Sequence, residues 1–196
     1  VQEFVDGVPL AQVLDSVRHL APNEIAALGA MLTRALAAAH DRGVVHRDVK
    51  PSNVMLTTSE PGLKLLDFGI SRVSTDEREA SLTASSHVLG TPEYMAPEQI
   101  LTPSEITDRC DVYLVGLVLY RMLAGRGPHV AETASQYLMA HAFEAPTALE
   151  TLSPTTTTSL AALVHACLAK APAERPSMQA LAEALEKEST GARCID

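Results

Sequence analysis

The feature that most constrains the fold is an apolar run from Val112 to Tyr120, which Arg121 ends. It is far shorter than the ~20 apolar residues that a membrane-spanning helix needs. A helix that is apolar on all sides but too short to span a bilayer is buried in a protein core. The run therefore predicts a buried helix over residues 108–124.

The composition is that of a globular domain. The chain has 196 residues, of which 46% are hydrophobic and 20% charged, and this length suffices for one domain with a core. Aromatic residues make up 4% and Trp is absent, so aliphatic side chains and Ala must fill that core. The net charge of −9 argues against nucleic acid or an anionic membrane as the main partner.

Cysteine and histidine give no sign of a metal site or a disulfide. The cysteines are Cys110, Cys167 and Cys194, an odd number without metal-ligand spacing. Six histidines are scattered in the same way: His19, His40, His87, His129, His141 and His165. We interpret the cysteines as reduced thiols and expect a cytoplasmic location, with a membrane anchor elsewhere in the full-length protein left open.

Periodicity predicts a mainly helical chain with a few short strands. The clearest helix begins at Pro22, with Glu24 in its first turn, and ends at Gly43. The other expected helices are 10–14, 132–143, 159–169 and 177–188, the last with Ser177 as N-cap. Short strand-like runs are expected at 1–5, 44–45, 54–56 and 63–66. Residues 69–92 are expected to form a long polar loop.

Five motifs occur in a fixed order along the chain. They are His46-Arg47-Asp48-Val49-Lys50-Pro51-Ser52-Asn53, Asp67-Phe68-Gly69, Gly90-Thr91-Pro92-Glu93-Tyr94-Met95-Ala96-Pro97-Glu98, Asp111-Val112-Tyr113 with Gly116, and Arg175-Pro176. In this order and spacing they resemble the eukaryotic-type (Hanks-type) protein kinase family, in its bacterial Ser/Thr branch. The resemblance implies an α+β, protein-kinase-like fold: a mainly helical C-terminal lobe over residues 1–188, followed by a tail over 189–196.

The resemblance also assigns the catalytic roles. It makes Asp48 the base that accepts the proton of a substrate Ser or Thr hydroxyl, and Lys50 the cation that stabilises charge on the γ-phosphate of ATP. Asn53 and Asp67 are the expected ligands of Mg²⁺ or Mn²⁺, since hard cations prefer oxygen ligands. Thr91 is expected to hydrogen-bond Asp48 and Lys50 and to favour Ser/Thr substrates.

Other positions match supporting residues of the family. His46 and Phe68 are expected to stack, and Gly69 to give the backbone freedom where the activation segment begins. Glu98 and Arg175 are expected to form a buried ion pair, and Asp111 to cap the backbone of the catalytic loop. Arg47 would pair with a phosphate on the activation segment. The candidate acceptors of that phosphate are Ser74, Thr75, Ser81, Thr83, Ser85 and Ser86.

The first residues resemble the hinge that binds adenine. The Glu3 carbonyl and the Val5 amide would face the base, and Met55 would pack beneath it. Gln2 would be a polar gatekeeper in place of the usual apolar one. Pro9 lies where a residue that contacts the ribose is common, so the hinge departs from the family pattern at two positions.

The Gly-rich loop, strand Lys and helix Glu that open the kinase signature have no counterpart in this sequence. Two hypotheses follow: the chain is the C-lobe of an active Ser/Thr kinase whose N-lobe lies upstream, or it is an inactive remnant that binds or scaffolds. In either case we expect little activity from these residues alone. We also expect self-association through apolar surface on the open side of the ATP cleft, near Val1, Phe4, Met55 and Leu66.

Overall fold

The structure, a computed structural model, describes residues 5–16, 20–60, 62–67 and 91–191. Its helices are α1 (Leu10–Ser16), α2 (Pro22–His40), α3 (Pro97–Leu101), α4 (Arg109–Ala124), α5 (Ala134–Phe143), α6 (Leu149–Leu152), α7 (Thr158–Cys167) and α8 (Met178–Gly191). The 3-10 turns are η1 (Pro51–Asn53), η3 (Pro92–Tyr94), η4 (Pro103–Glu105) and η5 (Pro172–Glu174). The strands are β1 (Val8–Pro9), β2 (Val54–Leu56) and β3 (Leu63–Leu65). Within those ranges, no helix combines the length and apolar composition that a bilayer crossing requires.

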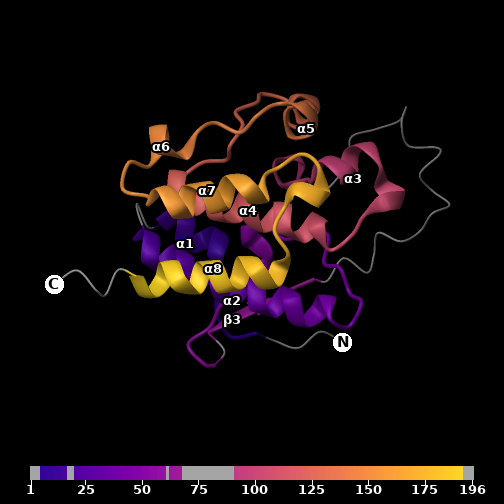
Figure 1. Cartoon of the computed structure of the whole chain (residues 1–196). Helices are drawn as coiled ribbons and strands as arrows, with labels where there is room; N and C mark the ends of the chain where they lie inside the picture. The colour runs from indigo at the N-terminus through magenta and orange to yellow at the C-terminus, as the bar shows by residue number, and fades with distance from the viewer. Residues whose placement is uncertain (1–4, 17–19, 61, 68–90, 192–196) are drawn as a thin grey trace.

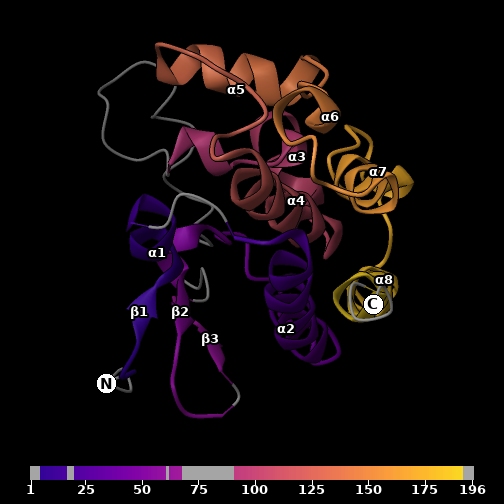
Figure 2. The same cartoon turned by 90° about the vertical axis from the view of Figure 1, so that its left-hand side faces the viewer.

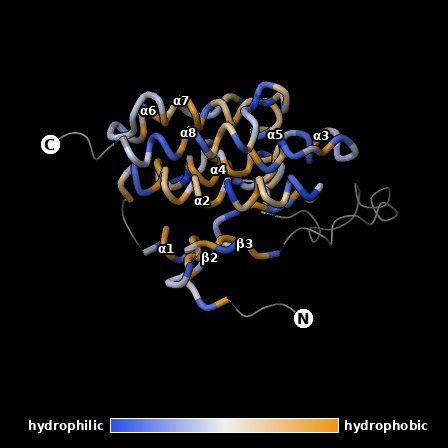
Figure 3. Tube along the Cα trace, turned by 60° about the horizontal axis from the view of Figure 1, so that its bottom comes forward, coloured by the Kyte–Doolittle hydropathy of each residue, from blue (hydrophilic) through white to orange (hydrophobic). Residues whose placement is uncertain are grey.

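Helix α4 forms the centre of the fold (Figure 1). Its residues from Cys110 to Tyr120 are all buried, as the apolar run predicts, and hydrophobic positions line its path (Figure 3). Helices α2 and α7 pack against it, and α8 packs along α2. The helix ends at Gly125, which adopts a left-handed conformation with φ of 72° that glycine accepts without steric cost.

The small sheet lies at one end of the molecule and α5 at the opposite end, with α4 between them (Figure 2). The strands run antiparallel in the order β1-β2-β3, and Val54 of β2 pairs with Leu65 of β3. This hairpin confirms the expected strands at 54–56 and 63–66. It holds the catalytic loop, which precedes β2, next to the segment that follows β3.

The ends of the helices follow local chemistry. Helix α2 begins at Pro22, and the Glu24 carboxylate accepts a hydrogen bond from the Ala21 N–H at 2.9 Å. Ser177 caps α8 as predicted, because its Oγ accepts a hydrogen bond from the Ala180 N–H at 3.1 Å. Helix α8 continues to Gly191, beyond the expected end at residue 188.

Two expectations are wrong. Val44 and Val45 form no strand, because the Val44 N–H donates to the Ala39 carbonyl at the end of α2 instead of to a neighbouring strand. Met55 is not part of an exposed apolar face, since it is only 8% exposed. It lies in the central strand of the sheet, between β1 and β3, and α1 also packs against that strand.

Candidate active site

Three predicted catalytic residues meet in the loop between α2 and β2. The Lys50 Nζ lies 3.0 Å from Oδ2 of Asp48, and the Asn53 side-chain amide donates to the same oxygen at 3.0 Å. The Asn53 amide also donates to the Asp48 carbonyl at 2.8 Å. Turn η1, which begins with Pro51, bends the chain so that Asn53 returns to Asp48. A carboxylate, an ammonium group and an amide are thus held together at a partly exposed position.

A buried carboxylate stabilises the backbone of this loop. Asp111, in the first turn of α4, is fully buried. Its two oxygens accept hydrogen bonds from the backbone N–H groups of His46 and Arg47, both at 2.8 Å. His40 donates a third hydrogen bond from Nε2 at 2.7 Å. Sequence reasoning anticipated the first two contacts but treated His40 as one of the scattered histidines.

The Arg47 backbone adopts a left-handed conformation, with φ of 66°. This conformation costs a non-glycine residue roughly 1–2 kcal/mol, so the surroundings must enforce it. They do so from both sides of the residue: Asp111 accepts from the Arg47 N–H, and Gln99 of α3 donates to the Arg47 carbonyl at 2.8 Å. The buried Arg47 Nε has no hydrogen-bond partner among the described residues.

Asp67 follows β3 and lies beside the catalytic loop. The Leu66 N–H donates to the Asn53 carbonyl at 2.8 Å, and His46 Nε2 donates to the Leu66 carbonyl at 3.0 Å. The Asp48 N–H donates to His46 Nδ1 at 3.3 Å, so these partners place the ring proton on Nε2. Asp67 has a left-handed φ of 53° and is exposed. The two segments that carry the expected metal ligands are therefore hydrogen-bonded to each other.

The donor set at this position fits Mg²⁺. The amide nitrogen of Asn53 donates its hydrogen bonds to Asp48. The Asn53 Oδ1 is therefore the atom that can bind a metal, next to the segment that carries Asp67. Mg²⁺ is commonly bound through one or two protein oxygens together with substrate phosphates and waters. Among the described residues, no group of three or more His, Cys, Asp or Glu forms a protein-only metal site. Asn53 and Asp67 would hold the cation together with ATP.

Glu98 and Arg175 form a buried, bidentate ion pair. Arg175 Nη1 lies 2.6 Å from Glu98 Oε1, and Nη2 lies 2.8 Å from Oε2. The guanidinium also donates to three backbone carbonyls, those of Arg109, Ala169 and Lys170. Its carbon lies 4.8 Å from the centre of the Tyr113 ring. The pair thus joins α3 to α4 and to the turn before α8.

A second buried polar cluster was not anticipated from the sequence. Lys170 Nζ donates to the Tyr113 hydroxyl at 3.4 Å, and that hydroxyl lies 3.1 Å from His141 Nδ1. His141 Nε2 then donates to the Glu93 carbonyl at 3.1 Å. Since a carbonyl only accepts, the His141 proton resides on Nε2 and Tyr113 donates to Nδ1. This directed chain ties turn η3 to α5 and α4.

Burial and nearby charge shift the pKa values of this cluster. Burial, with the neighbouring His129 and the Lys170 cation, lowers the pKa of His141 to about 3. Burial and the neighbouring Arg175 cation together lower the pKa of Lys170 to about 8, whereas burial raises the pKa of Tyr113 well above its ordinary value. His141 is therefore neutral at neutral pH, which agrees with its hydrogen bonds.

The other predicted site residues differ in their exposure, and some lie outside the described residues. Val5 is partly exposed, and Met55 is buried in β2. Thr91 is exposed at the start of η3, and the described residues include no hydrogen bond from its hydroxyl to Asp48 or Lys50, so that contact stays a prediction. Glu3, Phe68, Gly69, the six candidate phosphate acceptors and Cys194 lie outside the described residues. Cys110 and Cys167 are free and buried, and burial raises the pKa of the Cys167 thiol to about 12.

Comparison with known proteins identifies the family of the chain. The protein kinase domain family matches residues 1–185, and the chain belongs to that family. It is 39% identical over 190 residues to serine/threonine-protein kinase pkn2 of Myxococcus xanthus, covering 94% of this chain and 23% of that protein. It is 37% identical over 180 residues to the probable serine/threonine-protein kinase PknB of Corynebacterium glutamicum, covering 89% and 27%. The chain thus spans about a quarter of the length of these relatives.

A solved structure shares the fold. The crystal structure of a double mutant of the Mycobacterium tuberculosis PknI kinase domain superposes with a TM-score of 0.69 at 26% identity. The match covers 95% of this chain and 64% of the PknI chain. The kinase fold expected from the sequence is confirmed.

Proposed function

We propose that the protein carrying this chain transfers the γ-phosphoryl group of Mg-ATP to Ser or Thr hydroxyls of proteins. The observation that carries the proposal is the cluster of Asp48, Lys50 and Asn53 beside the Asp67 segment. The names of the relatives support the Ser/Thr class. ATP, Mg²⁺ (or Mn²⁺) and a protein substrate are the partners implied, with no role for nucleic acid.

The geometry suits proton transfer and charge stabilisation during phosphoryl transfer. The substrate oxygen forms a bond to the γ-phosphorus, the bond from that phosphorus to the β–γ bridging oxygen breaks, and ADP leaves. Asp48 orients the hydroxyl and accepts its proton. Lys50, 3.0 Å from that carboxylate, can neutralise charge on the transferring group. When bound, Mg²⁺ supplies further positive charge at the phosphates.

Around this centre, Val5, Met55 and Glu3 are the proposed adenine contacts. Thr91 is proposed to hydrogen-bond Asp48 and Lys50 and so to favour Ser/Thr substrates. Arg47 is the proposed partner of a phosphate on the activation segment, and its buried Nε, which has no hydrogen-bond partner among the described residues, supports this role. We propose a cytoplasmic position for this domain. Self-association through the open side of the ATP cleft stays a prediction, now without Met55.

The test compares the full-length protein with its Asp48→Asn variant. Transfer of labelled phosphate from ATP to myelin basic protein should fall by about 10²–10⁴-fold in the variant, because the base is lost. Asp41→Asn changes an exposed carboxylate at the end of α2 and should leave transfer unchanged. Equal activity in Asp48→Asn and wild type would overturn the catalytic role, and no transfer by the folded wild-type protein would favour the scaffold hypothesis.

The 196-residue chain by itself should transfer little phosphate. The Gly-rich loop and strand Lys that grip the phosphates in the family have no counterpart in its sequence. The same assay on this chain and on the full-length protein measures the difference. Robust transfer by the chain alone, abolished by Asp48→Asn, would contradict this expectation.

A further inference from the structure

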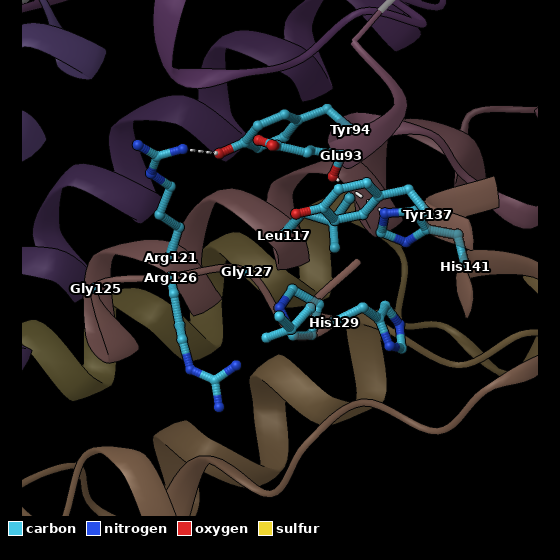
Figure 4. Close-up of a pocket in the computed structure, with 12 residues that line it drawn as sticks. Glu93, Tyr94, Leu117, Arg121, Gly125, Arg126, Gly127, His129, Tyr137 and His141 are labelled. Carbon is cyan, nitrogen blue, oxygen red and sulfur yellow. Dashed lines mark hydrogen bonds between the residues drawn. The ribbon is translucent and has the colours of Figure 1, made fainter. Parts of the chain in front are cut away.

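A pocket of about 360 Å³ lies between the last turns of α4, the loop that follows, α5 and turn η3 (Figure 4). Leu117 and Arg121 line it from α4, His129 from the loop, and Tyr137 from α5. Glu93 and Tyr94 contribute the wall from η3. The function proposed above uses none of these side chains.

The charge of the pocket is opposite to that of the chain. Arg121 and Arg126 line it together with one acidic residue, Glu93, whereas the whole chain carries a net charge of −9. Its two histidines add no charge at neutral pH, because burial lowers the pKa of His129 to about 4 and that of His141 to about 3. The pocket therefore presents an excess of positive charge, which favours an anionic group.

The strongest donor in the pocket is only loosely engaged. Arg121 reaches the Tyr94 hydroxyl at 3.4 Å (Figure 4). It also reaches Asp15 at 3.5 Å, and both distances are at the outer limit of a hydrogen bond. The Asp15 side chain is 73% exposed, so its pair with Arg121 contributes little. The guanidinium has five N–H donors in a planar fork that matches a carboxylate. Arg121 thus has capacity for a further, closer partner.

A buried ring nitrogen lies in the same wall of the pocket. His129 is 7% exposed, and its Nε2 forms no hydrogen bond with any described residue. Leaving a buried polar atom unpaired costs free energy that a bound polar group would recover. Arg121 and His129 therefore independently indicate a polar ligand in this pocket.

The pocket shares a wall with the segment that supports the catalytic loop. Glu93 and Tyr94 belong to turn η3, which begins directly after Thr91, and the chain continues into α3, where Gln99 donates to the Arg47 carbonyl beside Asp48. We propose that the pocket binds an Asp or Glu side chain of the protein substrate, with Arg121 as the residue that determines this specificity. This inference rests on the proposed kinase function and names the substrate feature that the domain selects.

The probes are labelled peptides with a single Thr in an Ala-based sequence. In each, one Glu, Gln or Lys occupies one of the five positions on either side of the Thr. Binding to the full-length protein is measured by fluorescence anisotropy, and phosphate transfer to myelin basic protein is measured separately. At one or more positions, Glu peptides should bind about tenfold tighter than their Gln counterparts, as a hydrogen bond to a charged group provides.

Arg121→Glu should reverse this preference, so that Lys peptides bind tighter than Glu peptides. Arg34→Glu is the matched control, since Arg34 is an exposed arginine on α2 that pairs with Glu186 far from the pocket. It should leave the preference as in wild type. Equal binding of Glu and Gln peptides, no peptide binding, or an unchanged preference in Arg121→Glu would each overturn the proposal. If transfer to myelin basic protein persists in those cases, the proposed function stands while the pocket assignment fails.

Discussion

His40 Nε2 donates a hydrogen bond of 2.7 Å to Oδ2 of Asp111, a residue 71 positions later in the chain. His40 is the last residue of α2, and Asp111 lies in the first turn of α4. The same carboxylate accepts from the backbone of His46 and Arg47. The contact therefore joins two core helices to the loop that carries Asp48.

Replacement of His40 should destabilise the fold through Asp111. His40→Ala removes one partner of a fully buried carboxylate and should lower the free energy of unfolding by about 1.5–3 kcal/mol. Urea denaturation followed by circular dichroism measures the change. Asp41→Ala, at the exposed neighbouring position, should stay within about 0.5 kcal/mol of wild type. Similar losses in the two variants would show that the contact with Asp111 contributes nothing.

Removing one partner of the buried Glu98–Arg175 ion pair should destabilise the fold. Glu98→Ala leaves the guanidinium of Arg175 without its carboxylate and should cost about 3–5 kcal/mol. Adding Arg175→Met removes the uncompensated charge, so the double variant should be more stable than Glu98→Ala. Denaturation midpoints of the three proteins test this order. A double variant less stable than the single one would indicate that the backbone contacts of Arg175 outweigh its buried charge.

Gly116 should not tolerate a side chain. A Cβ at this position would lie 2.8 Å from Cys167 Cβ, which is fixed by the backbone of α7. Ala favours a helix by about 1 kcal/mol over Gly, but overpacking costs about 1–3 kcal/mol, so Gly116→Ala should be destabilising. Gly127→Ala is the matched control, because the nearest atom is 3.8 Å away. Thermal unfolding compares the two, and equal melting temperatures would contradict the close contact.

Mild acid should destabilise the protein through His141 and His129. Their pKa values fall from 6.5 to about 3 and about 4 on folding, so the unfolded chain binds more protons between those values and 6.5. The free energy of unfolding should therefore decrease as the pH is lowered from 6.5. The loss approaches about 1.4 kcal/mol per pH unit for each ring, and little change from these rings is expected above pH 6.5.

Urea denaturation at pH 6.5 and pH 5 gives the difference to be tested. His141→Gln should reduce that difference by about half, because one of the two titrating rings is gone. Comparing the pH difference within each protein removes any constant cost of the substitution itself. An identical pH difference in wild type and His141→Gln would show that His141 does not remain neutral in the folded chain.

Local sequence signals predicted much of the fold. The apolar run located α4, and the Pro22 and Ser177 signals located the starts of α2 and α8. Val44 and Val45 were misread as a strand because β-branched composition does not reveal that the Val44 N–H bonds back to α2. The short helices α3 and α6 were missed because a single turn gives no periodicity to detect.

The candidate active site also has a part that the sequence predicted and a part that it did not. Asp48, Lys50 and Asn53 lie within one loop, so a motif could predict their meeting. The contact of His40 with Asp111, and the chain from Lys170 through Tyr113 to His141, join residues from separate elements. Only the tertiary packing of the helices brings those side chains together, and no spacing in the sequence encodes it.

The packing of α2 against α8 bears on how the protein matures on the ribosome. The Arg34–Glu186 contact in this pair spans 152 positions, and Leu185 of α8 lies over Gly29 of α2. During synthesis, α2 emerges long before α8 exists. Until α8 leaves the exit tunnel, the apolar surface of α2 that α8 covers stays exposed. Binding of a chaperone to the growing chain would shield that surface from aggregation.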